Sequence, residues 1–195
     1  MKRLKLAILI SGRGSNMQAI LDACEAADYP AEPVMVLSNI PLAEGLGIAK
    51  GRGVPVGAID HRPFGKDREA FERQINQALV EAGAEIIALA GFMRVLTPWF
   101  VGQWEGRMIN IHPSLLPKYP GLHTHKRALE AGDTYHGCTV HWVSAEVDQG
   151  AAIDQAQLEI QLGDTPDILA ERLLPLEHEL YPRALKKACS QILGI

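Results

Sequence analysis

The sequence predicts one α/β domain: a doubly wound, mostly parallel sheet with an antiparallel C-terminal edge and a long C-terminal helix. Apolar runs of strand length alternate with amphipathic helical segments through the first half. Residues 85–90 are almost entirely apolar, as in a strand covered on both faces. The last two strand-like runs lie too close together for a crossover helix. With 195 residues, 47% of them hydrophobic, the chain can bury one sizeable core.

The first half of the chain alternates between strands and helices. Residues 5–10 are an apolar run of strand length, and a glycine-containing turn separates them from apolar positions at helical spacing. A second strand, a short helix and a third strand are predicted in order at residues 33–38, 43–50 and 56–59. This βαβαβ pattern is typical of a parallel sheet with helical crossovers.

Helix caps mark the middle of the chain. Asp67 is predicted to cap a helix that Gly83 ends, and the fourth, apolar strand follows. Thr97 and Pro98 offer a cap and a first-turn proline for a short helix. The strand at residues 107–112 comes next, and it is the most informative stretch of the sequence.

The last third predicts the edge of the sheet and its covering helix. A short helix is expected at residues 126–131, and strands at 137–143 and 152–162 should pair as an antiparallel hairpin. Thr165 opens the final helix, in which we expect a bend or break near Pro175, because proline removes a helical hydrogen bond and clashes with the preceding turn. The whole of residues 1–195 is expected to form a single domain.

Composition excludes several classes of protein. A formal net charge of −4 leaves no basic footprint for nucleic acid. The three cysteines are widely spaced without a Cys-x-x-Cys pair, which indicates reduced thiols in the cytoplasm. The N-terminal apolar run is too short for a signal peptide, and no apolar stretch approaches the length of a membrane span.

Asn110 and His112 are the first candidates for chemistry. Alternation along the strand puts both side chains on one face at its carboxyl end, where open α/β sheets bind ligands, and Pro113 ends the ladder. An amide donor beside an imidazole suits a developing oxyanion. A strand-end cap and a surface histidine are the alternative. Three prolines, a glycine and two further histidines fill residues 113–125, and this stiff polar loop favours function.

A second candidate site is the turn at residues 11–16. Backbone N–H groups between a strand and a helix form an anion site that suits a phosphate. The turn fits neither the dinucleotide fingerprint nor the P-loop. The alternative is a tight turn in which Ser15 or Asn16 caps the helix.

Two further segments allow both a structural and a functional interpretation. Asp148 lies in the loop between the last two strands, and from the residues alone it is most simply a turn aspartate. Residues 91–96 follow the fourth strand at the same sheet edge, where they are either core under a loop or the wall of a flat apolar pocket.

The histidines raise the possibility of a metal hydrolase. A His-x-His pair with a nearby carboxylate can bind zinc. The sequence has no His-Glu-x-x-His motif, so loop and strand histidines are the simpler interpretation, and we expect no metal. The residues concerned are His123, His125, His136, His141 and His178.

The segment Asn-Ile-His-Pro-Ser-Leu-Leu-Pro at residues 110–117 resembles the signature of the formyltetrahydrofolate-using formyltransferases. The continuation at residues 118–125 is similar to the purine-biosynthesis branch of that family, and the resemblance runs from Ile10 to Glu177. It implies transfer of a formyl group from 10-formyltetrahydrofolate, a co-substrate, to the amine of glycinamide ribonucleotide, without a metal. It also implies small-molecule partners, no nucleic acid or membrane, a cytoplasmic location and a monomer or homodimer.

The resemblance also implies a role for individual residues. It implies a catalytic role for three residues, Asn110, His112 and Asp148, and it implies that His123 and His141 line the active site. Substrate binding falls on the turn and the final helix, at Gly14, Ser15, Asn16 and Glu177. Folate binding falls on Arg68, Met93, Arg94, Val95, Leu96 and Asn110.

The resemblance divides the domain into a phosphate-binding half, about residues 1–105, and a folate-binding and catalytic half, about 106–195. Alternatives within and outside the family remain. A deformylase would hydrolyse the same folate, and a transfer-RNA formyltransferase would carry a further basic domain, which we do not expect here. A phosphate-binding regulatory module would use only the first turn.

Overall fold

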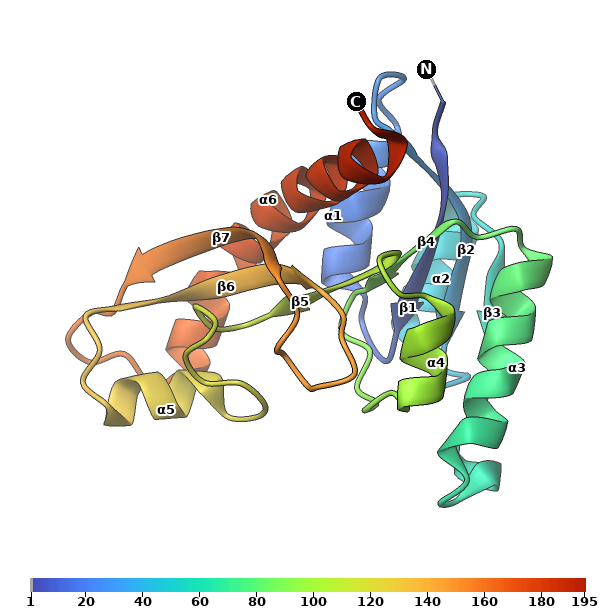
Figure 1. The fold of residues 1–195 in the computed structure, drawn as a ribbon. Coiled ribbons are helices and arrows are strands. Elements are labelled where there is room, and N and C mark those ends of the chain that lie inside the picture. The colour runs from blue at the N-terminus through green and yellow to red at the C-terminus, as the bar shows by residue number, and fades with distance from the viewer. Residues whose placement is uncertain (1) are drawn as a thin grey trace.

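The computed structural model describes residues 2–195 and contains one seven-stranded sheet of order β3-β2-β1-β4-β5-β6-β7 (Figure 1). The strands from β3 to β5 in that order are parallel. β6 is antiparallel to β5, and β7 is antiparallel to β6. The predicted fold class, a doubly wound sheet with an antiparallel C-terminal edge, is confirmed.

Every predicted element is present, with its ends moved by a few residues. The elements are β1 Leu4–Ile10, α1 Ser15–Cys24, β2 Ala31–Ser38, α2 Glu44–Gly51, β3 Val56–Ala58, the 3-10 turn η1 Arg62–Phe64, α3 Arg68–Glu81, β4 Ile86–Leu89, α4 Pro98–Gln103, β5 Met108–His112, α5 Thr124–Glu130, β6 Tyr135–Trp142, β7 Ala152–Glu159 and α6 Pro166–Leu193. β7 ends before residue 162, because the Asp164 carboxylate turns back to accept from the Gln161 N–H (2.8 Å).

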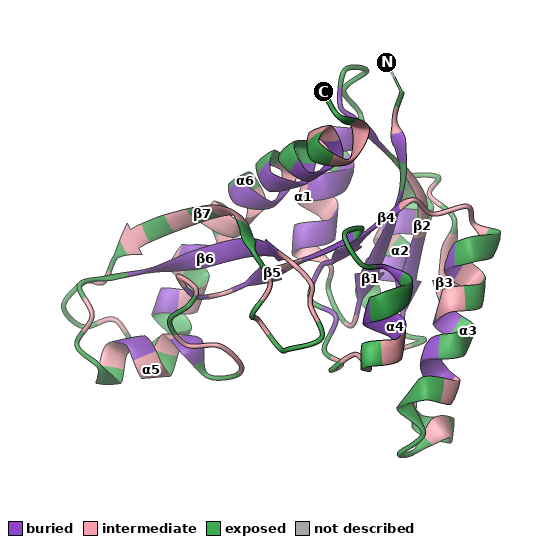
Figure 2. Cartoon of the chain, viewed as in Figure 1, coloured by how far each residue is buried: buried purple, intermediate pink, exposed green. Residues whose placement is uncertain are grey.

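Two layers of helices cover the central sheet. Leu6 and Ile8 face α1, α2 and α6, whereas Ala7 and Leu9 face α3 and α4, and all four side chains are buried. Figure 2 shows the central strands buried and the outward faces of the helices exposed. This two-sided burial explains why the central strands are apolar along their whole length.

Side-chain caps fix the starts of three helices. Asp67, Thr97 and Thr165 each accept a hydrogen bond from the third backbone N–H that follows them. The predicted caps at Asp67 and Thr97 are therefore confirmed, and each satisfies an N–H group that has no partner within its helix.

The final helix does not break near Pro175, because α6 is one continuous helix through Pro175 and Pro182, and a bend there stays a prediction. Pro175 deprives the Glu171 carbonyl of its helical donor, but both residues are exposed, so water can bond that oxygen. Burial of Leu173 and Leu180 on the opposite face holds the helix against the sheet. Among residues 2–195, no helix combines the length and apolar character that a membrane span requires.

The sheet order brings the loops after β1 and β4 together. β1 pairs with β2 on one side and with β4 on the other, so the strand order reverses between β1 and β4, where open α/β sheets bind ligands. The Ser11 N–H donates to the Gly91 carbonyl (3.1 Å), and the Met93 N–H donates to Ser11 Oγ (2.8 Å). The candidate phosphate turn and the 91–96 segment are thus neighbours.

Tyr181 anchors α6 to the same edge of the sheet. Its side chain is fully buried, and its hydroxyl lies 2.9 Å from the Leu89 carbonyl and 3.3 Å from the Ile109 carbonyl. Glu177 lies one turn earlier on the same face of the helix. Glu177 is therefore one helical turn from this anchor, and its carboxylate accepts from Asn16 at the start of α1.

Candidate active site

A cavity of about 700 Å³ lies at the carboxyl edge of the sheet. The end of β4, β5, β6 and the loops at 91–96, 121–125 and 143–148 form it. Nine of the predicted site residues line this cavity: Met93, Arg94, Val95, Leu96, Asn110, His112, His123, His141 and Asp148.

A close contact between the His112 imidazole and the Asp148 carboxylate lies in this cavity. His112 Nδ1 is 3.3 Å from Asp148 Oδ2, and the two side chains are only 7% and 10% exposed. Burial raises the pKa of the Asp148 carboxyl, but the nearby His141 imidazole, a hydrogen bond from the Gly121 N–H and the His112 imidazole together leave it below its usual value. Asp148 is therefore an ionised carboxylate held inside the protein.

The second ring nitrogen of His112 has a partner too. Nε2 lies 2.9 Å from the Tyr119 carbonyl, which can only accept, so Nε2 carries a proton. Nδ1 faces a carboxylate, and both contacts are satisfied when the ring is an imidazolium. The 3.3 Å contact is longer than the roughly 2.7–2.9 Å usual for charged pairs. Nδ1 thus has room for a further contact with a ligand in the cavity.

His141 links Asn110 to the same carboxylate. Its Nδ1 lies 2.9 Å from the Trp142 carbonyl and therefore carries a proton, which leaves Nε2 to face Asn110 Nδ2 (3.4 Å) and Asp148 Oδ1 (3.6 Å). The Asn110 amide is half-buried, and among residues 2–195 this long contact is its one hydrogen bond to a side chain. Asn110 can accordingly donate to a ligand in the cavity.

Asp148 also joins the two loops beside the cavity. Its Oδ2 accepts from the Gly121 N–H (2.8 Å), so it connects the loop after β5 to the loop after β6. Its backbone is left-handed, with φ 56°, a conformation that aspartate tolerates better than most residues. The interpretation of Asp148 as a simple turn residue does not account for these contacts.

Segment 91–96 forms an exposed apolar wall. Met93 is 75% and Val95 56% exposed, so neither belongs to the core, whereas Leu96 packs partly against the core. Leu122 and Val147, on the other lining loops, are exposed as well. These side chains give the cavity an apolar rim.

Arg68 does not line the cavity but contacts its wall. Arg68 Nη1 lies 3.4 Å from the Val95 carbonyl, a long hydrogen bond from an exposed side chain. The arginine is therefore near the position that the family resemblance implies, and the structure shows no closer contact with the cavity.

The turn after β1 presents an uncapped helix start. Gly14 is the N-cap of α1 in the left-handed conformation (φ 73°), and no side chain caps the helix, so the alternative of a Ser15 or Asn16 cap is wrong. On the other side of the turn, the Gly45 N–H donates to the Gly12 carbonyl (3.1 Å). A Cβ at Gly45 would lie 2.6 Å from the Ile10 side chain and 3.1 Å from that carbonyl. Close packing on the carbonyl side leaves the first-turn N–H groups for an anion.

Asn16 and Glu177 form a second polar group, outside the lining of the cavity. Asn16 Nδ2 donates to Glu177 Oε2 (2.7 Å), and within residues 2–195 the buried Asn16 Oδ1 has no partner. Burial raises the pKa of Glu177, and the bond from Asn16 offsets part of this effect. Gly14, Ser15, Asn16 and Glu177 thus lie at the meeting of α1 and α6, and Ser11 connects their turn to the cavity wall.

His125 and His136 form a pair that sequence reasoning did not assign. His125 Nδ1 lies 3.0 Å from His136 Nε2, so the two nitrogens share one proton. Burial, together with His125, lowers the pKa of His136 from 6.5 to about 4. Among residues 2–195, no cluster of three or more His, Cys, Asp or Glu side chains is arranged to hold a metal ion.

Residues 4–185 match the model of a family described as formyl transferase. The chain belongs to this formyltransferase family. Its curated relatives include the phosphoribosylglycinamide formyltransferase of Escherichia coli (strain K12), 44% identical over 92% of this chain and 84% of that protein. The trifunctional purine biosynthetic protein adenosine-3 of Drosophila melanogaster is 48% identical over 94% of this chain, which spans only 14% of that relative's length.

Solved structures of formyltransferases share the whole fold. The phosphoribosylglycinamide formyltransferase of Brucella melitensis has a TM-score of 0.91 and 46% identity, with 97% of each chain covered. Glycinamide ribonucleotide transformylase 1 of Symbiobacterium toebii has a TM-score of 0.90 and 39% identity, covering 94% of this chain and 86% of its own. The similarity in sequence and structure therefore extends over nearly the whole of this formyltransferase.

The His125–His136 pair predicts acid sensitivity of this formyltransferase. The pKa of His136 is about 4 in the folded protein against 6.5 ordinarily, so the unfolded chain binds more protons between these values. The free energy of unfolding should therefore be at its full value above pH 6.5 and fall as the pH drops toward 4. Urea unfolding at pH 7.5 and about pH 5 measures this loss.

A His136→Gln variant is the matched comparison. It should lose less stability than the wild type between those two pH values, because glutamine does not titrate. An equal loss in both proteins would assign the acid sensitivity to other groups.

Proposed function

We propose that this formyltransferase transfers the formyl group of 10-formyltetrahydrofolate to the amine of N1-(5-phosphoribosyl)glycinamide, a step of purine biosynthesis. One observation carries the proposal: Asn110, His112 and Asp148 lie together in an apolar-rimmed cavity, with an ionised carboxylate against an imidazole. This chain aligns with most of the length of two bacterial relatives, and the names of these relatives support the choice of substrate.

The folate fits the cavity in size and character. A volume of about 700 Å³ is ordinary for a small-molecule site, and a mostly apolar wall suits a flat aromatic ring. Met93, Val95 and Leu96 would contact the ring faces while backbone groups of this segment and Arg94 read its polar edge. Arg68, on the outer side of the wall, would face the acidic tail of the folate.

The ribonucleotide would bind beside the cavity, at the polar group formed by the start of α1 and Glu177. Its phosphate would accept from the first-turn N–H groups at Gly14, Ser15 and Asn16, where the helix dipole also favours an anion. Its amine would meet Glu177, and the unpaired Asn16 Oδ1 offers a further acceptor for a substrate N–H. The reacting amine would then approach the formyl group across the edge of the sheet.

The reaction begins when the amine nitrogen attacks the formyl carbon. The carbonyl electron pair moves onto oxygen, and the tetrahedral oxyanion accepts from Asn110 Nδ2 and His112 Nδ1. The Asp148 carboxylate keeps His112 in its charged form and takes the amine proton through an ordered water. The carbon–nitrogen bond to the folate then breaks as that nitrogen gains a proton, and His123 and His141 line the space around the reacting groups.

The same proposal includes the setting of the enzyme. We place the phosphate-binding half at about residues 1–105 and the folate-binding and catalytic half at about 106–195. A cytoplasmic location fits three free, buried cysteines, and a monomer or homodimer would suffice, because all the named site residues belong to one chain.

Consumption of 10-formyltetrahydrofolate by the purified protein tests the proposed function. The assay is run with and without glycinamide ribonucleotide and with no metal added. Consumption only when the amine is present, with formation of the N-formyl product, is the expected result. Consumption without the amine would mean hydrolysis, and no consumption in either case would contradict an enzyme of this class.

Asn110→Ala removes one donor to the oxyanion. The kcat for formyl transfer should fall about 100-fold to 1,000-fold, the usual effect of losing one such donor. The midpoint of urea unfolding should change little, because the Asn110 amide makes a single long contact with another side chain. Wild-type turnover in this variant would exclude Asn110 from oxyanion stabilisation.

A further inference from the structure

Tyr119 holds the catalytic imidazole through its backbone. Its carbonyl accepts from His112 Nε2 (2.9 Å) and lies 3.4 Å from Ser114 Oγ. The Tyr119 backbone is left-handed, with φ 55°, which is unfavourable for a residue with a large side chain. Such a conformation persists only where surrounding contacts determine it.

The side chain of Tyr119 supplies those contacts. Its hydroxyl donates to Asp133 Oδ2 (2.8 Å), and the Arg127 guanidinium stacks over its ring, 5.2 Å from the centroid. Arg127 also donates to the carbonyl of the next residue, Pro120 (2.6 Å). The aromatic ring is thus fixed at both its edge and its face.

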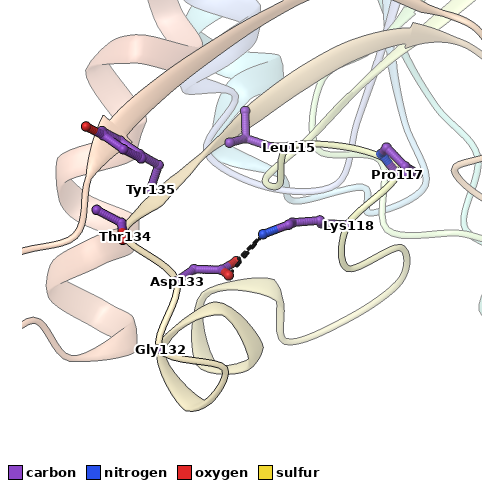
Figure 3. Close-up of a pocket in the computed structure, with 7 residues that line it drawn as sticks. All are labelled: Leu115, Pro117, Lys118, Gly132, Asp133, Thr134 and Tyr135. Carbon is purple, nitrogen blue, oxygen red and sulfur yellow. Dashed lines mark hydrogen bonds and ion pairs between the residues drawn. The ribbon is translucent and has the colours of Figure 1, made fainter.

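Asp133 bonds to two consecutive residues of the loop after β5, Lys118 and Tyr119. It follows α5, where its N–H donates to the Ala128 carbonyl (3.2 Å), and its carboxylate accepts from Lys118 Nζ at 3.0 and 3.1 Å. Bonds from Lys118 and Tyr119 hold the pKa of Asp133 below its usual value. Figure 3 shows this Lys118–Asp133 pair beside an open cavity of about 520 Å³, separate from the residues assigned to substrate binding.

We propose that Asp133 is a positioning residue for formyl transfer, acting on His112 through the hydroxyl and the backbone carbonyl of Tyr119. The proposal rests on the proposed function, because it gives Asp133 a role in the reaction of that site. Asp133 fixes the ring of Tyr119, the ring fixes the left-handed backbone, and the carbonyl fixes the proton on His112 Nε2.

The contact with Tyr119 determines which ring nitrogen of His112 faces the reacting groups. With Nε2 committed to the Tyr119 carbonyl, Nδ1 is the nitrogen that faces both Asp148 and the cavity. Release of Tyr119 would let its backbone relax and leave the imidazole free to turn. The reacting groups would then lose their alignment while both substrates still bind.

Tyr119→Phe and Asp133→Ala test the proposal. Removal of the hydroxyl, or of its acceptor, should lower kcat about 10-fold to 100-fold, the size of effect that small misplacements of reacting groups produce. The KM values for folate and ribonucleotide should change less than twofold or so, because neither residue is placed at a binding contact. Asp133→Asn keeps an oxygen that accepts from the hydroxyl and should recover most of the loss.

Nuclear magnetic resonance of the His112 ring supplies a readout that is independent of turnover. The Nε2–H signal should be protected from exchange with water in the wild type and lost in Tyr119→Phe, because its carbonyl acceptor is released. Tyr135→Phe is the matched control: Tyr135 is an exposed tyrosine lining the same open cavity, and its variant should keep wild-type kcat and the protected signal.

Full kcat together with a protected Nε2–H signal in Tyr119→Phe would overturn the proposal. If Asp133→Ala does not fold, Tyr119→Phe alone decides, because it removes one oxygen atom. If the wild type does not transfer formyl groups, the proposed function fails, and the protected signal still decides whether Tyr119 holds His112.

Discussion

The buried carboxylate of Asp148 is the constraint on which the site depends. An ionised group inside a protein must be paired and hydrogen-bonded, and Asp148 has His112, His141 and the Gly121 N–H around it. These partners come from β5, from β6 and from the loop after β5, so one side chain sets the relative positions of three segments. The same contacts place His112 Nδ1 beside a carboxylate at the cavity, and the chemistry we propose needs this placement.

The order of the sheet supplies the rest of the site. Reversal of the strand order between β1 and β4 places the uncapped start of α1 beside an apolar wall, and Ser11 bonds to the segment after β4 through both its N–H and its hydroxyl. Tyr181 fixes α6 to the carbonyls of β4 and β5, which brings Glu177 toward the same edge. Two ligands of different character, one flat and apolar and one anionic, can therefore meet at a single edge.

Local patterns in the sequence predicted much of this architecture. Hydrophobic periodicity and caps located the elements, and alternation along β5 placed Asn110 and His112 on one face, both of which line the cavity. Of the predicted bend or break at Pro175, the break does not occur, because the lost bond lies on the exposed side while the buried stripe of α6 stays intact. The proximity of Asp148 to His112 and the pairing of His136 depend on contacts between distant segments. The contact of Tyr119 with His112 uses a backbone carbonyl, which every residue possesses. No residue pattern signals these, and only the family resemblance pointed to Asp148.

Formyl transfer by an Asp148→Asn variant tests the central claim most directly. Asparagine keeps the shape and an oxygen for the Gly121 N–H but removes the negative charge beside His112. We predict a folded protein with nearly unchanged KM values and a kcat lowered by about 100-fold or more, the usual scale for a lost acid–base group. A variant with wild-type kcat would contradict the account, because the buried ion pair would then have no part in the reaction.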